Sequence, residues 1–424
     1  MAPTTGAATS TTLPATYVLQ SGDSPSAVAD RFGVTVAELA AANLDNPDYA
    51  RFLVGMEIRL PSSGPTPSSA AATTSPVTSP VTNLAAPAGV DGVVTLAFTG
   101  DIVAHRAVNR GAAQPDGTYD YNSMFDHLRP FLSGFDLAIC HMEQPIAPDE
   151  NVIVEPPTLS IDASVTAAVA AAGYDRCSTA SNHSLDRGAA GIDATVAAFA
   201  AAGIGQSGMA STADTRLPAL VTVNGVRIAH LSYTFSYNGY PPIPGEEWRS
   251  NLIDPALVIS DAQAMRARGA EAVIVSFHWG IERVVEPTGF QREVAEAVTA
   301  SGEVDLIVGH HAHVLQPIEQ VNGVWVVWGM GNVLSNHPTS SQWPASSQDA
   351  AVFTTALHRG PDGSISVDRP VVHPTWCDTS GTGFLIRFTS EADDPSVPID
   401  EATRAQLRIS EQRTRDLLGD YVAA

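Results

Sequence analysis

The hydrophobic pattern divides the chain into a short N-terminal region and a long C-terminal one. In the short region, residues 17–20 and 56–60 each predict a strand, the second by strict alternation of apolar and polar positions. Between them, apolar residues at helical spacing predict a helix over 25–32, and Thr35 with Glu38 forms the capping box of a second helix. The predicted order is therefore strand, helix, helix, strand.

The long region alternates apolar runs with amphipathic segments. The expected strands occupy residues 93–99, 137–140, 176–179, 272–277 and 305–308. A helix is expected over 189–202, ending at Gly203, and Asn224-Gly225 predicts a tight turn between two short strands. Strands that alternate with helices predict an α/β sheet, in which ligands gather beyond the carboxyl ends of the strands.

Residues 62–90 separate the two regions. This stretch contains five prolines but no charged and no aromatic residue, so it cannot bury enough apolar surface to fold. We therefore expect a small domain over 16–61, a disordered linker rich in Pro, Ser, Thr and Ala over 62–90, and a large domain over 91–424.

The charge of the chain excludes several functions. Asp and Glu number 45 against 22 basic residues, all of them arginine, and the formal net charge of -23 disfavours nucleic acid as a partner. Without lysine, the chain has neither a P-loop nor a Schiff-base nucleophile. No apolar run reaches the roughly 18 residues that a membrane-spanning helix needs. The start lacks a basic cluster followed by an apolar stretch, so we expect a mature exported protein whose signal peptide has been replaced by Met1.

Some residues that could carry chemistry are expected to be structural. Cys140, Cys177 and Cys377 are too few and too scattered for a disulfide framework, and we expect them to be small buried apolar side chains. Trp279, Trp325 and Trp328 are expected in the core. A lone histidine on a strand is usually packed and hydrogen-bonded, and His230 is interpreted in this way.

Potential metal ligands follow nearly every strand of the long region. They are Asp101, Glu143, Asn182, His278, His310, His311 and His313. Residues at strand ends can converge on one point at the edge of a sheet. A donor set of carboxylate, amide oxygen and imidazole suits Mn, Fe or Zn. A carboxylate that bridges two such ions, about 3.5–4 Å apart, would support a displacement reaction.

The short region also carries a set of motifs in a fixed order. They are Tyr17-Val18, Gly22-Asp23-Ser24, Phe32-Gly33-Val34, Leu39, Ala42-Asn43, Val54-Gly55 and Ile58-Arg59-Leu60-Pro61. Together they resemble a LysM domain, and the resemblance covers residues 16–61. It implies a βααβ module that binds polymers of N-acetylglucosamine, usually peptidoglycan, at Gly22, Asp23 and Ser24 and at the loop before the last strand. A small folded cap without a ligand is the alternative.

A second ordered set of motifs lies between residues 93 and 335. They are Gly100-Asp101, Met142-Glu143-Gln144-Pro145, 181–186 (SNHSLD), 278–282 (HWGIE), 309–317 (GHHAHVLQP) and 329–332 (GMGN). Together they resemble the CapA family of poly-gamma-glutamate capsule biosynthesis proteins, which is similar in fold to the calcineurin-like metallophosphoesterases. The resemblance implies a four-layer α-β-β-α sandwich with a binuclear metal site.

The same resemblance implies roles for individual residues. Asp101 would ligate one metal and Glu143 would bridge two. The shells would be completed by Asn182, His278, His311 and His313. His183 is the implied general acid, since an imidazole titrates near neutrality. There are two further candidates. Asp186 either caps the helix that begins near residue 188 or holds His183 in one tautomer. Glu282 is a ligand, a proton acceptor or a salt-bridge partner of Arg283 or another arginine.

The chain departs from the family pattern at two of these motifs. The metallophosphoesterases open with Asp-x-His, but Val103 stands at the histidine position and the first histidine is His105, which could reach the metal from the loop. Glu143 stands where the metallophosphoesterases use Asp, and His141 where CapA relatives usually carry Asn. A longer carboxylate could widen the site and weaken one metal position.

Two functions follow from this interpretation. In the first, the protein is an extracellular, wall-associated and metal-dependent hydrolase, held on peptidoglycan by its LysM domain, that cleaves a phosphoester or a gamma-glutamyl polymer. In the second, the metal site is degenerate and the protein is a non-catalytic accessory protein for capsule polymer synthesis or anchoring. Poly-gamma-glutamate is a polyanion, so the charge disfavours it as a partner unless bound metal or arginines such as Arg106 and Arg110 reverse the field near the site.

Overall fold

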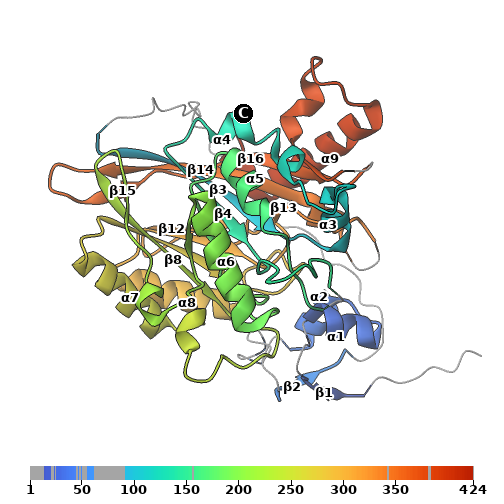
Figure 1. Ribbon diagram of the computed structural model, residues 1–424, viewed down its shortest axis with the longest axis horizontal. Coiled ribbons are helices and arrows are strands. Elements are labelled where there is room, and N and C mark those ends of the chain that lie inside the picture. Colours follow the sequence, from blue (N-terminus) through green and yellow to red (C-terminus); the bar gives the residue numbers. More distant parts are fainter. Residues whose placement is uncertain are drawn as a thin grey trace, which may run out of the picture.

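A computed structural model places two stacked β-sheets at the centre of the molecule, with helices on their outer sides (Figure 1). The structure describes residues 14–20, 23, 25–43, 46, 49, 55–61, 91–154, 157–340, 343–380 and 383–423. The linker predicted over 62–90 lies outside these residues, as do Gly22 and Ser24 of the predicted glycan groove.

The larger sheet has nine strands among the described residues. Along its main path the order is β17 (Leu385–Phe388), β16 (Val371–Asp378), β14 (Asp349–Arg359), β3 (Val93–Ile102), β4 (Leu137–Met142), β5 (Arg176–Ser178) and β6 (Gly205–Ser207). β13 (Asn332–Leu334) pairs with β3, and β15 (Ile365–Val367) pairs with β14. Since β3, β4, β5 and β6 are parallel, their carboxyl ends lie at one edge.

The smaller sheet has six strands within the described ranges. Their order is β11 (Ile318–Val321), β12 (Val324–Val327), β10 (Leu306–His310), β9 (Ala272–His278), β8 (Val226–Thr234) and β7 (Val221–Val223). β8, β9, β10 and β12 are parallel. The predicted tight turn between β7 and β8 is confirmed, because Asn224 and Gly225 both have positive φ, 47° and 77°.

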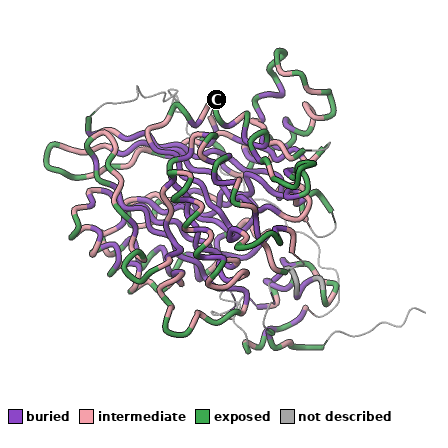
Figure 2. Tube along the Cα trace, viewed as in Figure 1, coloured by how far each residue is buried: buried purple, intermediate pink, exposed green. Residues whose placement is uncertain are grey.

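Alternation along the strands produces the layers. In β3, Val94, Leu96 and Phe98 pack between the two sheets against side chains of the smaller sheet, whereas Ala97 and Ile102 face the helices on the other side. The strands of the smaller sheet alternate in the same way, so each sheet is buried on both faces. Figure 2 shows the buried positions gathered along these strands. The four-layer α-β-β-α sandwich predicted for the large domain is confirmed.

Helices cover the outer face of each sheet. The larger sheet is covered by α3 (Arg106–Ala112), α4 (Arg129–Leu132), α5 (Ser164–Ala171) and α6 (Gly188–Ala202). The smaller sheet is covered by α7 (Pro255–Ala267) and α8 (Gly289–Ala300), and α9 (Glu401–Leu418) packs against β16. Short 3₁₀ helices occupy Asn122–Phe125, Ala213–Thr215, Glu247–Arg249, Ala345–Gln348, Thr389–Asp393 and Gly419–Tyr421. As predicted, α6 ends at Gly203, which adopts a left-handed conformation with φ 74°.

The short region folds in the predicted order. It consists of β1 (Thr16–Val18), α1 (Pro25–Phe32), α2 (Val36–Ala41) and β2 (Glu57–Arg59), and β1 pairs with β2 in antiparallel register. The capping box predicted before α2 is present, since the Thr35 side chain accepts from the Glu38 backbone N–H and the Glu38 carboxylate accepts from the Thr35 backbone N–H.

Two of the three cysteines differ from the prediction. Cys140 on β4 and Cys177 on β5 form a disulfide, so the prediction that all three cysteines are simple buried apolar side chains was wrong for this pair. The two residues are direct register partners on adjacent parallel strands, a proximity that 37 positions of sequence separation conceal. Cys377 is buried and free, as predicted.

The predictions are confirmed for Trp279, Trp328 and His230, whereas Trp325 on β12 is only partly buried. Trp279 and Trp328 are fully buried and their rings stack, with centroids 5.6 Å apart. His230 is buried on β8 and its Nε2 is hydrogen-bonded to Ser276 Oγ at 2.9 Å. Across the described parts of the chain, none of the helices has the length and apolar character needed to span a bilayer.

Candidate metal site

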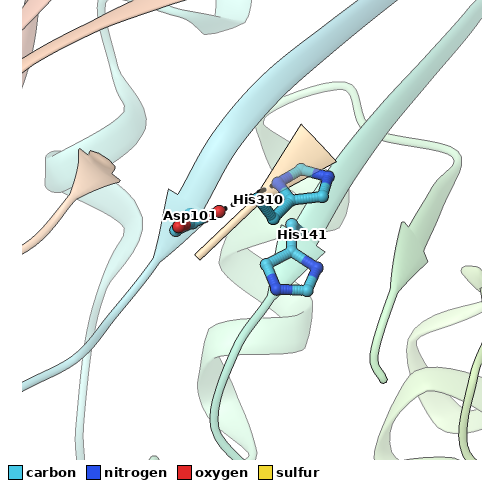
Figure 3. A group of neighbouring side chains, drawn as sticks. All are labelled: Asp101, His141 and His310. Atoms are coloured by element: carbon cyan, nitrogen blue, oxygen red, sulfur yellow. Dashed lines mark hydrogen bonds and ion pairs between the residues drawn. The ribbon is translucent and has the colours of Figure 1, made fainter. Parts of the chain in front are cut away.

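Strand ends from both sheets meet at one point. Register places Asp101 of β3 beside His141 of β4 in the larger sheet, and His278 of β9 beside His310 of β10 in the smaller sheet. The two sheets bring these pairs together: the His141 ring stacks on His310 with centroids 4.1 Å apart (Figure 3). The expected convergence of polar residues at the carboxyl ends of the strands therefore takes place.

Two glycines allow the strands to approach this closely. A Cβ at Gly100, just before Asp101, would lie 2.1 Å from the carbonyl oxygen of Gly331. A Cβ at Gly309, just before His310, would lie 1.9 Å from the carbonyl oxygen of Trp328. Real Cβ atoms do not come this close to backbone oxygens, so the glycine at the start of each of these two motifs has a steric cause.

Asp101 is the anchor of the site. It is 1% exposed, its Oδ1 accepts a hydrogen bond from His310 Nδ1 at 2.8 Å, and its Oδ2 accepts one from the backbone N–H of His311 at 3.0 Å. Burial alone would raise the pKa of Asp101, but its contacts with His310 and His313 hold that pKa well below the ordinary value. The residue is therefore a carboxylate with both oxygens already engaged.

A second chain of hydrogen bonds links three more potential metal ligands. His141 Nε2 is hydrogen-bonded to His278 Nδ1 at 2.9 Å, and His278 Nε2 to Asn182 Oδ1 at 2.8 Å. His141 Nδ1 is in turn held by Ser178 Oγ at 2.8 Å. Burial lowers the pKa of both His141 and His278 well below the ordinary value, so both rings are neutral. A neutral imidazole can bind a metal ion through a ring nitrogen.

Glu143 and His311 differ from these residues. Both are fully buried, yet neither oxygen of Glu143 and neither ring nitrogen of His311 has a hydrogen-bond partner in the described part of the chain. Glu143 Oε1 lies 3.6 Å from His313 Nε2 and 3.8 Å from His183 Nε2, which is beyond hydrogen-bond distance. Burial raises the pKa of Glu143 to about 7 and lowers that of His311 to about 3.

The donors group in a way that fits a metal. Four sets have ligand atoms within 4.8 Å of one another: Asp101, His141 and His310; His141, Glu143 and His278; Glu282, His311 and His313; and Asp101, Glu143 and His313. Glu143 belongs to two of these sets, as a bridging carboxylate would. Buried polar atoms without partners are rare in native proteins, and an ion between the sets would satisfy those of Glu143 and His311.

His313 is held in place by Asn332. Its Nδ1 is hydrogen-bonded to Asn332 Oδ1 at 2.8 Å, and Asn332 Nδ2 donates to the His313 backbone carbonyl at 3.2 Å. Burial opposes protonation, but the carboxylates of Glu143 and Asp101 raise the pKa of His313 to about 10. His311 and His313 both have positive φ, 86° and 55°, a strained conformation that tends to occur at functional sites.

His183 and Asp186 form a pair beside this cluster. His183 Nδ1 is hydrogen-bonded to Asp186 Oδ2 at 2.7 Å, and Asp186 also accepts from the backbone N–H of Leu159. Burial disfavours the charged imidazole, yet Asp186 outweighs it and the pKa of His183 lies above the ordinary value. Of the two roles considered for Asp186, the structure has the one that holds His183, because α6 follows Arg187 with no side-chain cap.

His105 lies outside the donor sets that the described residues form. It packs edge-on against His337, with ring centroids 4.3 Å apart, and its Nδ1 accepts from the backbone N–H of Asn336 at 3.3 Å. Val103 is buried, 1% exposed. The structure therefore brings together the other six predicted metal-site residues without His105.

Sequence reasoning missed two residues at the site. His141 was noted only as a departure from the family pattern, and His337 was not considered. A histidine two positions before a predicted ligand was the available signal for His141, whereas no signal pointed to His337. Arg283, which was considered as a salt-bridge partner of Glu282, has its guanidinium 3.6 Å from that carboxylate and 4.4 Å from the centre of the Trp343 ring.

In the LysM-like region, Asp23 has a structural position. It is 2% exposed, and its Oδ2 accepts from the Tyr17 hydroxyl and from the Gln20 backbone N–H, both at 2.7 Å. Arg31 forms an ion pair with its other oxygen at 2.9 Å. Asp23 therefore holds the turn after β1 and does not present a free carboxylate.

Comparison with protein families finds a match for each of the two regions of the chain. Residues 95–337 match the family model described as Bacterial capsule synthesis protein PGA_cap, and residues 17–61 match the LysM domain. The first match spans more than half of the chain. The protein belongs to this family of bacterial capsule synthesis proteins and carries a LysM domain at its N-terminal side.

Two relatives are the CapA proteins of bacilli. The chain is 26% identical to "PGA biosynthesis protein CapA" of Bacillus subtilis (strain 168) over 294 residues, which cover 67% of this chain and 73% of that protein. It is 29% identical to "Capsule biosynthesis protein CapA" of Bacillus anthracis over 247 residues, which cover 56% of this chain and 59% of that protein. The chain thus spans less than two thirds of the second relative.

Among solved structures, the chain has distant likenesses. They include the NAD nucleotidase of Haemophilus influenzae, with a TM-score of 0.44 and 14% identity over 78% of this chain and 64% of that one. They also include the calcineurin-like phosphoesterase YfkN of Bacillus subtilis, with a TM-score of 0.41 and 16% identity over 76% of this chain and 98% of that one. At these scores the likeness says nothing about activity.

Proposed function

We propose that this protein is a wall-associated, metal-dependent hydrolase of poly-gamma-glutamate capsule metabolism. The observation that carries the proposal is Glu143, whose two buried oxygens lie without hydrogen bonds where two donor sets meet. An unsatisfied buried polar atom costs about 1–3 kcal/mol, more when it is charged. Divalent ions between the sets would satisfy these oxygens and the ring of His311.

The chain supplies residues for each part of a hydrolytic site. Asp101, Glu143, Asn182, His278, His311 and His313 would hold two divalent ions of the Mn, Fe or Zn type, with Glu143 as the bridge. Such ions supply Lewis acidity and lower the pKa of a water molecule. Glu282 shares a donor set with His311 and His313 and would act as a further ligand or proton acceptor.

His183 would move the proton. Its Nδ1 is held by Asp186, so that its Nε2 points toward Glu143, 3.8 Å away. From this position Nε2 would donate a proton to the leaving atom while water adds to the other side of the cleaved bond. The substrate would be a phosphoester or a gamma-glutamyl bond of the capsule polymer.

The LysM domain would hold this activity at the cell wall. The resemblance to LysM domains implies binding to polymers of N-acetylglucosamine, so peptidoglycan is the proposed partner. Because both domains belong to one chain, binding of the LysM domain to the wall would keep the large domain close to it. If deletion of residues 1–61 leaves binding to insoluble peptidoglycan unchanged, the anchoring role is contradicted.

One observation favours a second candidate, a non-catalytic accessory protein. Val103 is buried at the position where the metallophosphoesterase pattern has a histidine, and His105 does not replace it. One position of a binuclear site would then lack a ligand. A site with weak or absent metal would leave the protein as a binder of wall and capsule polymer.

Metal analysis separates the two candidates. The protein should be purified without chelator and without nickel affinity, with Asp101→Ala and His311→Ala prepared in parallel. The hydrolase proposal expects close to two equivalents of transition metal in the wild type and a strong loss in both variants. Less than about a tenth of an equivalent, with no hydrolysis after addition of Mn or Zn, would exclude it.

A further inference from the structure

The LysM domain and the large domain share one apolar cluster. The LysM members of this cluster are Leu19, Val28, Ala29, Val36, Leu39, Ala40, Tyr49, Ile58 and Leu60. The same cluster continues into the outer face of the smaller sheet and into α8. Figure 1 shows α1 and α2 beside the large domain. Two domains that were joined only by a linker would have separate cores, so the cluster indicates a docked arrangement.

The cluster reaches the metal site at the segment between β9 and α8. Ile281 is a buried member, Val284 packs against the cluster from its edge, and Phe290 is the second residue of α8. Ile281 and Val284 bracket Glu282 and Arg283. The segment that carries one of the candidate metal ligands therefore also contributes residues to the cluster shared with the LysM domain.

Tyr49 is a LysM member of the same cluster. It is 3% exposed, although it stands in the connection between α2 and β2. Burial, and next the charge of Glu282, raise the pKa of its phenol well above the ordinary value. The phenol is therefore within electrostatic reach of Glu282, which shares a donor set with His311 and His313.

We propose that residues 281–290 form a docking surface for the LysM domain of the same chain, and that the docked domain, through Tyr49, closes one side of the metal site. The docking itself is independent of the proposed hydrolase function, and only the effect on access rests on it. Two domains of one chain can meet at an effective concentration in the millimolar range, so an interface with a Kd of ~1 mM is enough to be populated. Wall attachment and access to the site would then be coupled.

Hydrogen exchange of the full, metal-free chain tests the docking. Tyr49→Ala removes this side chain from the cluster, and Val18→Ala is the matched control, since Val18 is an apolar LysM residue that is 44% exposed. We expect peptides within 281–290 to exchange at least about fivefold faster in Tyr49→Ala than in the wild type, with no change in Val18→Ala. Should Tyr49→Ala unfold the LysM domain, the surface loses its partner and the same increase is expected. Equal exchange at 281–290 in all three proteins would overturn the proposal.

Metal release tests the effect on access. Manganese-loaded wild type and Tyr49→Ala are mixed with excess chelator, and the release of the ion is followed. Release is expected to be severalfold faster in Tyr49→Ala, and equal rates would overturn the access role. A protein that takes up no manganese contradicts the proposed function, whereas the exchange experiment still decides the docking.

Discussion

The candidate metal site has two halves that differ in how their polar atoms are satisfied. The paired half consists of Asp101, His141, Asn182, His278 and His310, which are linked to one another or to the backbone by hydrogen bonds of 2.8 to 3.0 Å. The open half consists of the side chains of Glu143 and His311, which have none in the described part of the chain. Folding alone satisfies the first half, whereas the second requires a ligand.

The largest expected effect is on metal binding by the open half. Glu143→Ala and His311→Ala each remove a donor whose atoms have no other partner. Loss of residues that only orient a ligand weakens metal binding about 10- to 100-fold, so loss of these donors should weaken it by well over ~100-fold. Isothermal titration with Mn or Zn measures the change. If a variant keeps the wild-type metal affinity, the residue that was substituted is not a metal ligand.

Without metal, substitutions in the paired half should lower the free energy of unfolding more than substitutions in the open half. Asp101→Ala leaves the His310 ring and the His311 backbone N–H without their acceptor, and a broken buried pair costs about 3 kcal/mol. Glu143→Gln removes a buried carboxylate that accepts no hydrogen bond and has only the longer ion pairs with His313 and His183, 3.6 and 3.8 Å away, so the free energy of unfolding should change by less than about 1 kcal/mol. Urea unfolding in the presence of chelator measures both. Equal losses in the two variants would erase the distinction.

A smaller effect is expected at Asn332, which orients His313. Asn332→Ala leaves the His313 ring free to turn and should weaken metal binding about tenfold. The same titration applies, and it should be corrected with the metal-free stability of the variant, because Asn332 Nδ2 also donates to two backbone carbonyls. An unchanged affinity would mean that His313 is not a ligand.

The smallest effect is expected at the edge of the paired half. Ser178→Ala removes the hydroxyl that holds His141 and should lower the free energy of unfolding by about 1 kcal/mol without a large change in metal affinity. Ser276→Ala is a matched control, because it removes the same kind of contact from His230, a buried histidine outside the site. A strong loss of metal affinity in Ser178→Ala, but not in Ser276→Ala, would mean that His141 takes part in metal binding.

Much of the fold could be predicted from the sequence because the signals are local. The capping box at Thr35, the turn at Asn224-Gly225 and the stop at Gly203 each depend on neighbours along the chain. Strand ends followed by polar residues also indicated the position of the site, since parallel strands share an edge.

The details of the site could not be predicted in the same way. The hydrogen bond between His141 and His278 joins residues 137 positions apart, and it depends on how the two sheets stack. The disulfide between Cys140 and Cys177 depends on register across two parallel strands. The positive φ of His311 cannot be recognised in a Gly-His-His-Ala-His motif, yet it decides which way the ring points. Such features belong to packing rather than to local pattern.

The most direct test of metal binding by Glu143 compares wild type and Glu143→Gln in urea unfolding, each with and without manganese. Saturating metal, at about 100 times its Kd, is expected to stabilise the wild type by about 2.7 kcal/mol. Without metal, Glu143→Gln is expected to be as stable as the wild type, but it should gain little from metal. A Glu143→Gln protein that is strongly destabilised without metal, or that gains as much from metal as the wild type, would contradict metal binding by Glu143.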